Sequence, residues 1–253
     1  MRILLIRHGQ PDYTTDSLTP AGRVEAELLS LRLARMDIRD FYVSPLGRAR
    51  ETADYTLRRV GKTAEVLPWL QEFRARYTDR ETGRRQIVWD RLPRLWTRYP
   101  ESFDPDRWTE LPFYTDSDAA EVWKETKEGT DALLARYGMR KDGPVWKAEH
   151  NGTETIALFC HFAISMAVMA YLMDLSPMIW WHRMLCPTSS VTEVVTEERV
   201  PGEVLFRATR VGDLTHLEMN GCPPSPYGLF PECYNGVDST DPLINGMPQR
   251  KGY

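Results

Sequence analysis

Residues 2–9 read RILLIRHG, a short apolar run that stops at Arg7, His8 and Gly9. A run of this length, bounded by polar residues, is typical of a buried strand. Polar side chains that follow such a strand lie where open α/β sheets place their functional sites. The stretch therefore predicts the first strand of the core and the loop that carries the chemistry.

The pattern that follows alternates between helix and strand. Thr19 is a suitable N-cap, Pro20 suits the first helical position, and apolar residues then recur at helical spacing. Further strands are expected at 41–43, 64–67 and 156–160, further helices at 49–60 and 164–175, and an antiparallel edge pair at 191–196 and 204–209. This alternation predicts the α/β class: a three-layer sandwich with a mainly parallel central sheet flanked by helices.

A long insertion follows the third expected strand. Residues 73–98 hold eight Arg and three acidic residues, a net charge of +5, and residues 101–131 hold ten acidic and three basic residues, a net charge of −7. Six of the eight Trp lie within 69–146. We expect residues 73–131 to form a helical cap subdomain. Its aromatic residues would form a small core, and its Arg residues either are solvated or face an anionic substrate.

The end of the chain has a different composition. Residues 221–253 hold six Pro and five Gly, which predicts irregular structure. The aromatic and apolar residues Tyr227, Leu229, Phe230 and Tyr234 indicate an extension that packs on the rest of the protein, with a disordered tail as the alternative. Residues 1–253 are otherwise expected to form a single domain.

The composition excludes several classes of protein. The chain has 253 residues, 42% hydrophobic and 27% charged, with a net charge of −4, so overall charge does not favour nucleic acid or an anionic membrane as a partner. No apolar run approaches the ~18 residues of a membrane span. The N-terminus does not resemble a secretory signal, and the four Cys lack the spacing of a metal site. We therefore expect a cytoplasmic protein.

Five side chains stand out because they follow the carboxyl ends of expected strands: Arg7, His8, Arg48, Glu72 and His161. Each has an ordinary structural explanation when taken alone, but together they suit phosphoryl transfer, in which catalysis consists mostly of positioning and neutralising charge. Arg7 and Arg48 would bind the phosphoryl oxygens, and His161 would add a further donor. His8 would be the nucleophile and Glu72 the proton donor.

These residues lie in motifs that resemble those of the histidine phosphatase superfamily, the phosphoglycerate-mutase-like fold. Arg7-His8-Gly9 resembles the RHG motif, residues 18–22 (LTPAG) the start of the first helix, and residues 44–53 (SPLGRARETA) the stretch that makes Arg48 the pocket arginine. Residues 70–72 (LQE) resemble the segment of the proton donor, residues 160–162 (CHF) that of the second pocket histidine, and residues 212–217 (GDLTHL) a stretch common in the bacterial branch.

The departures from the family pattern bear on the activity. Residues 10–13 (QPDY) stand where the mutase branch has a longer segment, which favours the phosphatase branch. Phe162 stands where the family usually has a small Gly after the histidine, so it would crowd the pocket. Gln10, Phe162 and Arg74 complete the expected substrate-binding residues.

The resemblance implies a phosphomonoesterase that works through a phosphohistidine on a small phosphorylated metabolite. It needs no metal or other cofactor, because two Arg and His161 carry the charge. Two alternatives stay open: phosphoryl transfer of the phosphoglycerate-mutase type, and a catalytically silent module that binds a phosphorylated ligand. The substrate and the oligomeric state, with a homodimer as one possibility, are not specified by the sequence.

Overall fold

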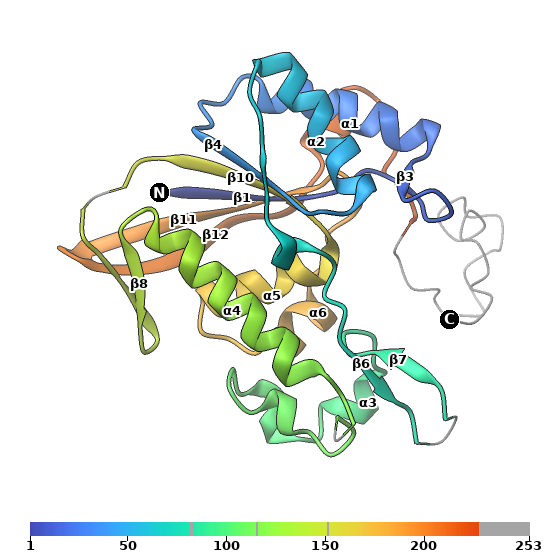
Figure 1. Cartoon of the computed structure of the whole chain (residues 1–253), viewed down its shortest axis with the longest axis vertical. Helices are drawn as coiled ribbons and strands as arrows, with labels where there is room; N and C mark the ends of the chain where they lie inside the picture. Colours follow the sequence, from blue (N-terminus) through green and yellow to red (C-terminus); the bar gives the residue numbers. More distant parts are fainter. Residues whose placement is uncertain (81–82, 115, 151, 228–253) are drawn as a thin grey trace.

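The computed structural model describes residues 1–80, 83–114, 116–150 and 152–227. Its centre is an eight-stranded sheet in the order β5-β4-β10-β1-β11-β12-β9-β8 (Figure 1). The strands are β1 (Arg2–Arg7), β4 (Asp40–Val43), β5 (Glu65–Val66), β8 (Met139–Asp142), β9 (Val145–Ala148), β10 (Thr155–Cys160), β11 (Val191–Val200) and β12 (Glu203–Asp213).

The sheet has a parallel half and an antiparallel half. Strands β5, β4, β10 and β1 pair in parallel, whereas β11, β12, β9 and β8 continue from β1 by antiparallel pairing. Six of the eight strands consequently point the same way, which confirms the predicted α/β class. The β11–β12 pair was expected at the edge of the sheet, but the β8–β9 hairpin lies beyond it.

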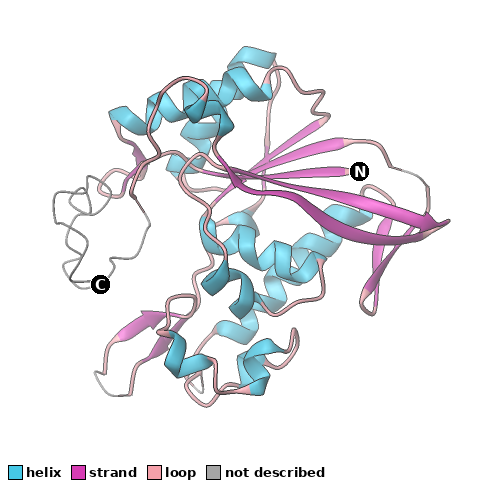
Figure 2. Ribbon diagram, turned by 180° about the vertical axis from the view of Figure 1, so that it is seen from behind, coloured by secondary structure: helices cyan, strands magenta, loops and turns pink. Residues whose placement is uncertain are grey.

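Helices cover both faces of the sheet, as Figures 1 and 2 show. Helices α1 (Pro20–Leu33) and α2 (Gly47–Val60) lie on one face; α4 (Ala119–Ala135), α5 (Phe162–Leu172) and α6 (Pro177–Arg183) lie on the other. Each face has its own apolar cluster, so the predicted three-layer sandwich is confirmed. Helix α5 ends at Leu172, three residues before the expected Leu175.

Helix α1 begins as its sequence predicts. The Thr19 hydroxyl accepts a hydrogen bond from the amide of Gly22 at 3.0 Å, and Pro20 occupies the first turn. Position 22 also requires glycine, because a Cβ there would lie 2.2 Å from the carbonyl oxygen of Gln10. The helix can therefore pack closely against the loop that leaves β1.

Residues 73–131 are less helical than expected. They contain a hairpin of β6 (Arg76–Thr78) and β7 (Arg85–Ile87), the short helix α3 (Pro93–Trp96), and the 3-10 helices η2 (Pro100–Phe103) and η3 (Trp108–Glu110). Helix α4 crosses the expected boundary at residue 131 and packs on α5 and β8. The last helix of the insertion is thus part of the layer that α4, α5 and α6 form on one face of the sheet.

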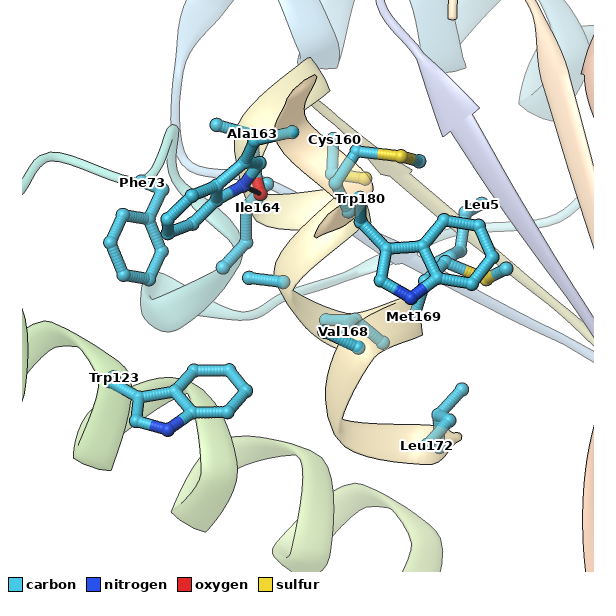
Figure 3. Packing of buried hydrophobic residues seen from close by; sticks show 14 of the residues in the cluster. Leu5, Phe73, Trp123, Cys160, Ala163, Ile164, Val168, Met169, Leu172 and Trp180 are labelled. Atoms are coloured by element: carbon cyan, nitrogen blue, oxygen red, sulfur yellow. Dashed lines mark hydrogen bonds between the residues drawn. The ribbon is translucent and has the colours of Figure 1, made fainter. Parts of the chain in front are cut away.

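The aromatic residues of the insertion join the core of that layer. Trp96, Trp108 and Trp123 are buried, and the ring of Trp108 meets those of Phe73 and Trp181 at centroid distances of 6.3 and 5.2 Å. Figure 3 shows side chains from several parts of the chain, among them Phe73, Trp123 and Trp180, gathered around α5. One continuous apolar cluster therefore holds the insertion against the helices below the sheet.

The remaining elements are short. Strands β2 (Pro11–Asp12) and β3 (Ser17–Leu18) form a small hairpin after β1, η1 (Pro68–Leu70) follows β5, and α7 (Thr215–Glu218) follows β12. Leu229, Phe230 and Tyr234 of the expected C-terminal extension lie outside the described residues. No helix in the described part of the chain is long and apolar enough to cross a membrane.

Candidate active site

Three neighbouring parallel strands end at the candidate site. His8 follows β1, His161 follows β10 and Ser44 follows β4, and the pairing of Arg7 with Cys160 brings the first two strand ends level. The imidazole centroids of His8 and His161 lie 5.1 Å apart. Two residues separated by 153 positions in the sequence thus form one buried histidine pair.

The orientation of His8 is fixed by its own loop. Its Nδ1 lies 2.7 Å from the carbonyl oxygen of Gly9, which can only accept a hydrogen bond, so Nδ1 carries the proton and Nε2 has the free electron pair. Burial, and then the charges of Arg7 and Arg48, lower the pKa of His8 well below its usual value. The imidazole is therefore neutral at pH 7.

Two guanidinium groups lie beside this pair. The Nε of Arg48 donates to Nε2 of His8 at 3.3 Å. Arg7 is 7% exposed and donates through Nη1 to the carbonyl oxygen of Cys186 at 2.6 Å. Its Nε atom is buried and has no partner among the described residues. The site thus concentrates positive charge and unused N–H groups around His8, which suits an anionic ligand.

Asp16, which the sequence did not single out, binds Arg48. Its Oδ1 accepts from Nη1 of Arg48 at 2.5 Å and its Oδ2 accepts from the amide of Gly47 at 2.6 Å. A Cβ on Gly47 would lie 2.2 Å from the carbonyl oxygen of Asp16, so only glycine permits this approach. The contact joins residues 32 positions apart, so no local sequence pattern predicts it.

His161 is held by a second residue that sequence reasoning missed. Its Nε2 lies 2.7 Å from the hydroxyl of Ser44, which also accepts from the amide of Leu46 at 3.2 Å. This arrangement favours a Ser44 hydroxyl that donates to Nε2, leaving the proton of His161 on Nδ1. Nδ1 is buried without a partner among the described residues. Burial, with His8 and the two arginines, lowers the pKa of His161 well below its usual value.

Glu72 lies at the first turn of α5. Its Oε1 accepts hydrogen bonds from the amides of Phe73, Ala163 and Ile164 at 3.0, 2.9 and 3.1 Å. Burial raises the pKa of this carboxyl and outweighs the opposing effects of the amides and arginines. Within the described residues all its hydrogen bonds end on Oε1, so a proton on this group resides on Oε2.

Gln10 and Phe162, which the sequence predicts to bind substrate, have different neighbours. Gln10 accepts from the hydroxyl of Thr19 at 2.6 Å and donates to that of Ser225 at 2.8 Å, so both ends of its amide are engaged. Phe162 is 8% exposed, and the guanidinium carbon of Arg7 lies 5.7 Å from its ring centroid. Phe162 therefore forms a wall beside Arg7.

Two of the arginines expected to face the substrate pair with acidic residues of the insertion. Both Nη atoms of Arg74 donate to the carboxylate of Glu125 at 2.7 Å, and Arg85 lies 3.8 Å from that of Asp116. The side chains of Arg76 and Arg84 are exposed. A role of these residues in substrate recognition stays a prediction.

The aromatic side chain of Trp89 in the insertion contacts the site. The ring of Trp89 meets that of Phe162 edge-on at 5.9 Å, and its Nε1 donates to the carbonyl oxygen of Phe73 at 3.1 Å. Across the site, Tyr13 lies 5.4 Å from the guanidinium carbon of Arg48 and 6.2 Å from the ring of Tyr227. The first part of the C-terminal extension therefore packs beside the loop that follows His8.

Comparison with known proteins adds a family match. The model of the histidine phosphatase superfamily (branch 1) matches residues 3–209. The serine/threonine-protein phosphatase Pgam5 of Caenorhabditis elegans, described as mitochondrial, is 47% identical over 76 residues. That match covers 28% of this chain and 27% of the relative, so the chain aligns with about a quarter of that protein.

Solved structures show the same fold at lower sequence identity. A phosphoserine phosphatase variant from Entamoeba histolytica, in complex with phosphoserine, has a TM-score of 0.56 and 19% identity and matches over 85% of this chain and 98% of its own. A mycobacterial glucosyl-3-phosphoglycerate phosphatase has a TM-score of 0.55 and 19% identity, over 83% and 98% of the two chains.

Proposed function

The chain belongs to the histidine phosphatase superfamily (branch 1), and from this membership and the geometry of its site we propose that it hydrolyses phosphate monoesters. The observation that carries the proposal is the state of His8. It is a neutral imidazole whose Nδ1–H is fixed on Gly9 and whose Nε2 lies beside Arg48 and the His161 ring. A nucleophile at phosphorus needs this free electron pair in a positively charged pocket.

In the first step, Nε2 of His8 attacks the phosphorus atom. The ester P–O bond breaks, and the leaving oxygen takes the proton from Oε2 of Glu72. The raised pKa of this carboxyl favours the protonated form that the step requires. The three amides on Oε1 hold the other oxygen, so the proton is directed away from α5.

In the second step, water attacks the phosphohistidine. Glu72, now a carboxylate, accepts a proton from the water as the water oxygen bonds to phosphorus. The P–N bond breaks, its electrons return to Nε2, and inorganic phosphate leaves with His8 again neutral. One carboxyl can serve both steps because the second reverses the proton transfer of the first.

Charge on the transferring phosphoryl group is stabilised by the groups around His8. Arg48 exchanges its long contact with Nε2 for a phosphoryl oxygen, and Arg7 contributes its free Nε–H. The Nδ1–H of His161 provides a neutral donor. Since these groups carry the charge, activity is expected to persist in a strong chelator; a loss restored by zinc or magnesium would contradict this mechanism.

The substrate class is proposed as a small phosphorylated metabolite. Phosphoserine and glucosyl-3-phosphoglycerate appear in the names of similar structures, so both belong in a substrate screen. A phosphoserine peptide belongs there too, because the local match to Pgam5 favours a protein phosphatase as the second candidate. Phosphoryl transfer between the carbons of phosphoglycerate would instead identify a mutase.

The decisive experiment combines turnover with covalent labelling. The wild-type protein should hydrolyse nitrophenyl phosphate and, quenched during turnover with a ³²P-labelled ester, retain acid-labile label. His8→Ala should lose both properties. Label that persists in His8→Ala would show that another residue is the nucleophile, with His161 the first candidate. No hydrolysis of any ester by the wild-type protein would favour a binding module.

A further inference from the structure

The loop between α6 and β11 contacts the backbone of Arg7 and His8. The amide of Ser189 donates to the carbonyl oxygen of His8 at 3.0 Å, and the carbonyl oxygen of Ser190 accepts from the amide of Arg7 at 3.1 Å. The amide of Gly9 donates to the hydroxyl of Thr52 at 3.0 Å. The peptide between His8 and Gly9 is thus held at its oxygen by one loop and at its nitrogen by α2.

Ser189 adopts an unfavourable backbone conformation to make this contact. Its φ angle is +57°, in the left-handed region that residues other than glycine rarely occupy. Such a conformation persists only where the surroundings enforce it, and it is often found at functional sites. Ser189 is also completely buried, so solvent does not stabilise the loop.

The side chain of His216 supplies the restraint. Its Nε2 lies 3.1 Å from the hydroxyl of Ser189, in a hydrogen bond that links the short helix α7 to the loop. Asn220 in turn donates through its amide group to the carbonyl oxygen of His216 at 2.9 Å. His216 is 4% exposed, and burial, together with Arg32, lowers its pKa to about 4. The imidazole therefore stays neutral at physiological pH.

We propose that Ser189 and His216 are positioning residues for the nucleophilic histidine. His216 fixes the hydroxyl of Ser189, Ser189 holds the His8–Gly9 peptide through its amide, and the Gly9 carbonyl in that stretch holds Nδ1 of His8. A rotation of the peptide would release Nδ1 and turn Nε2 away from phosphorus. The inference rests on the proposed role of His8 as nucleophile.

Kinetics of matched variants measure the effect. Ser189→Ala keeps a non-glycine residue at the strained position and removes its anchor, and His216→Leu removes the same hydrogen bond from the other side. Each should lower kcat for nitrophenyl phosphate ~10–100-fold with KM changed less than about threefold, because misplacement of a reacting group by ~1 Å costs about 100-fold. His216→Gln, which can still reach the hydroxyl, should recover most of kcat.

Two comparisons separate positioning from ordinary loss of stability. The double variant should be no slower than either single variant, because both substitutions remove the same hydrogen bond between Ser189 and His216. Ser102→Ala is the control: Ser102 is equally buried, and its hydroxyl donates to the carbonyl oxygen of Trp96 in the insertion at 2.8 Å, so removal of this hydroxyl should lower Tm and leave kcat unchanged.

Nuclear magnetic resonance of ¹⁵N-labelled histidine tests the link without turnover. The wild-type spectrum should show His8 as the Nδ1–H tautomer, and Ser189→Ala and His216→Leu should shift it toward a mixture of tautomers. Unchanged kcat and an unchanged His8 spectrum in both variants would overturn the inference. If the wild-type protein hydrolyses no ester, the proposed function fails, while the spectra still decide whether His216 controls His8.

Discussion

Among single residues, Glu72, the proposed proton donor, gives the sharpest test. Glu72→Gln keeps the shape of the side chain but removes its proton, so kcat for alkyl esters should fall ~10²–10⁴-fold. Nitrophenyl phosphate should be affected far less, because its leaving oxygen scarcely needs protonation. Steady-state rates on both esters measure the difference.

Glu125→Gln is a matched control, because Glu125 pairs with Arg74 on the surface of the insertion. An equal loss on both esters in Glu72→Gln would remove this residue from the acid role. Glu51, whose carboxylate accepts from the amide of Leu18, would then become the candidate.

The pKa values of the two principal groups predict an acidic pH optimum for alkyl esters. The pKa of His8 is lowered, so its neutral form is present from well below pH 6.5 upward. The pKa of Glu72 is raised above 4.5, so its protonated form persists beyond that pH and declines as pH rises through the raised value. The profile of kcat/KM should therefore be bell-shaped, and Glu72→Gln should lack its alkaline limb. A falling limb retained in that variant would assign it to another group.

At the scale of elements, the start of α1 couples helix stability to the loop after His8. The hydroxyl of Thr19 caps the helix at Gly22 and also donates to the side chain of Gln10. Thr19→Ala should lower the free energy of unfolding by about 1 kcal/mol, the usual cost of a lost N-cap. Urea denaturation measures this, with the exposed Thr15→Ala as control. Equal stabilities of the two variants would show that water replaces the cap.

At the scale of the whole molecule, Trp108 joins the insertion to the helices below the sheet. It is completely buried against Phe73, Trp123 and Trp181. Trp108→Ala should lower the free energy of unfolding by about 3–5 kcal/mol, the range for deleting a buried aromatic side chain. Phe103→Ala, at a residue 44% exposed, should change it much less. A separate early transition of the insertion in a denaturation curve would contradict a shared core.

The sequence predicted those parts of the molecule that local patterns determine. The run before Arg7, the cap at Thr19 and the strand before His161 are contiguous signals, and parallel pairing then brings the histidines together. Strands β8 and β9 were missed because MRKD and VWKA are only four residues long; the two strands pair with each other, and β9 joins the sheet by pairing with β12. Asp16, Ser44 and Ser189 were missed because their role depends on contacts with residues distant in sequence.

The carboxylate of Asp16 bears on product inhibition. In the absence of substrate Arg48 already holds an anion, one that is tethered to the same chain and therefore present at a high effective concentration. Inorganic phosphate must displace it to stay bound, so the pocket is expected to resist inhibition by its own product. Asp16→Asn should lower the competitive inhibition constant of phosphate ~10-fold, whereas Asp12→Asn in the same hairpin should not; equal constants would limit Asp16 to holding the loop. If the constant falls as expected, the tethered carboxylate sets the phosphate concentration at which hydrolysis slows.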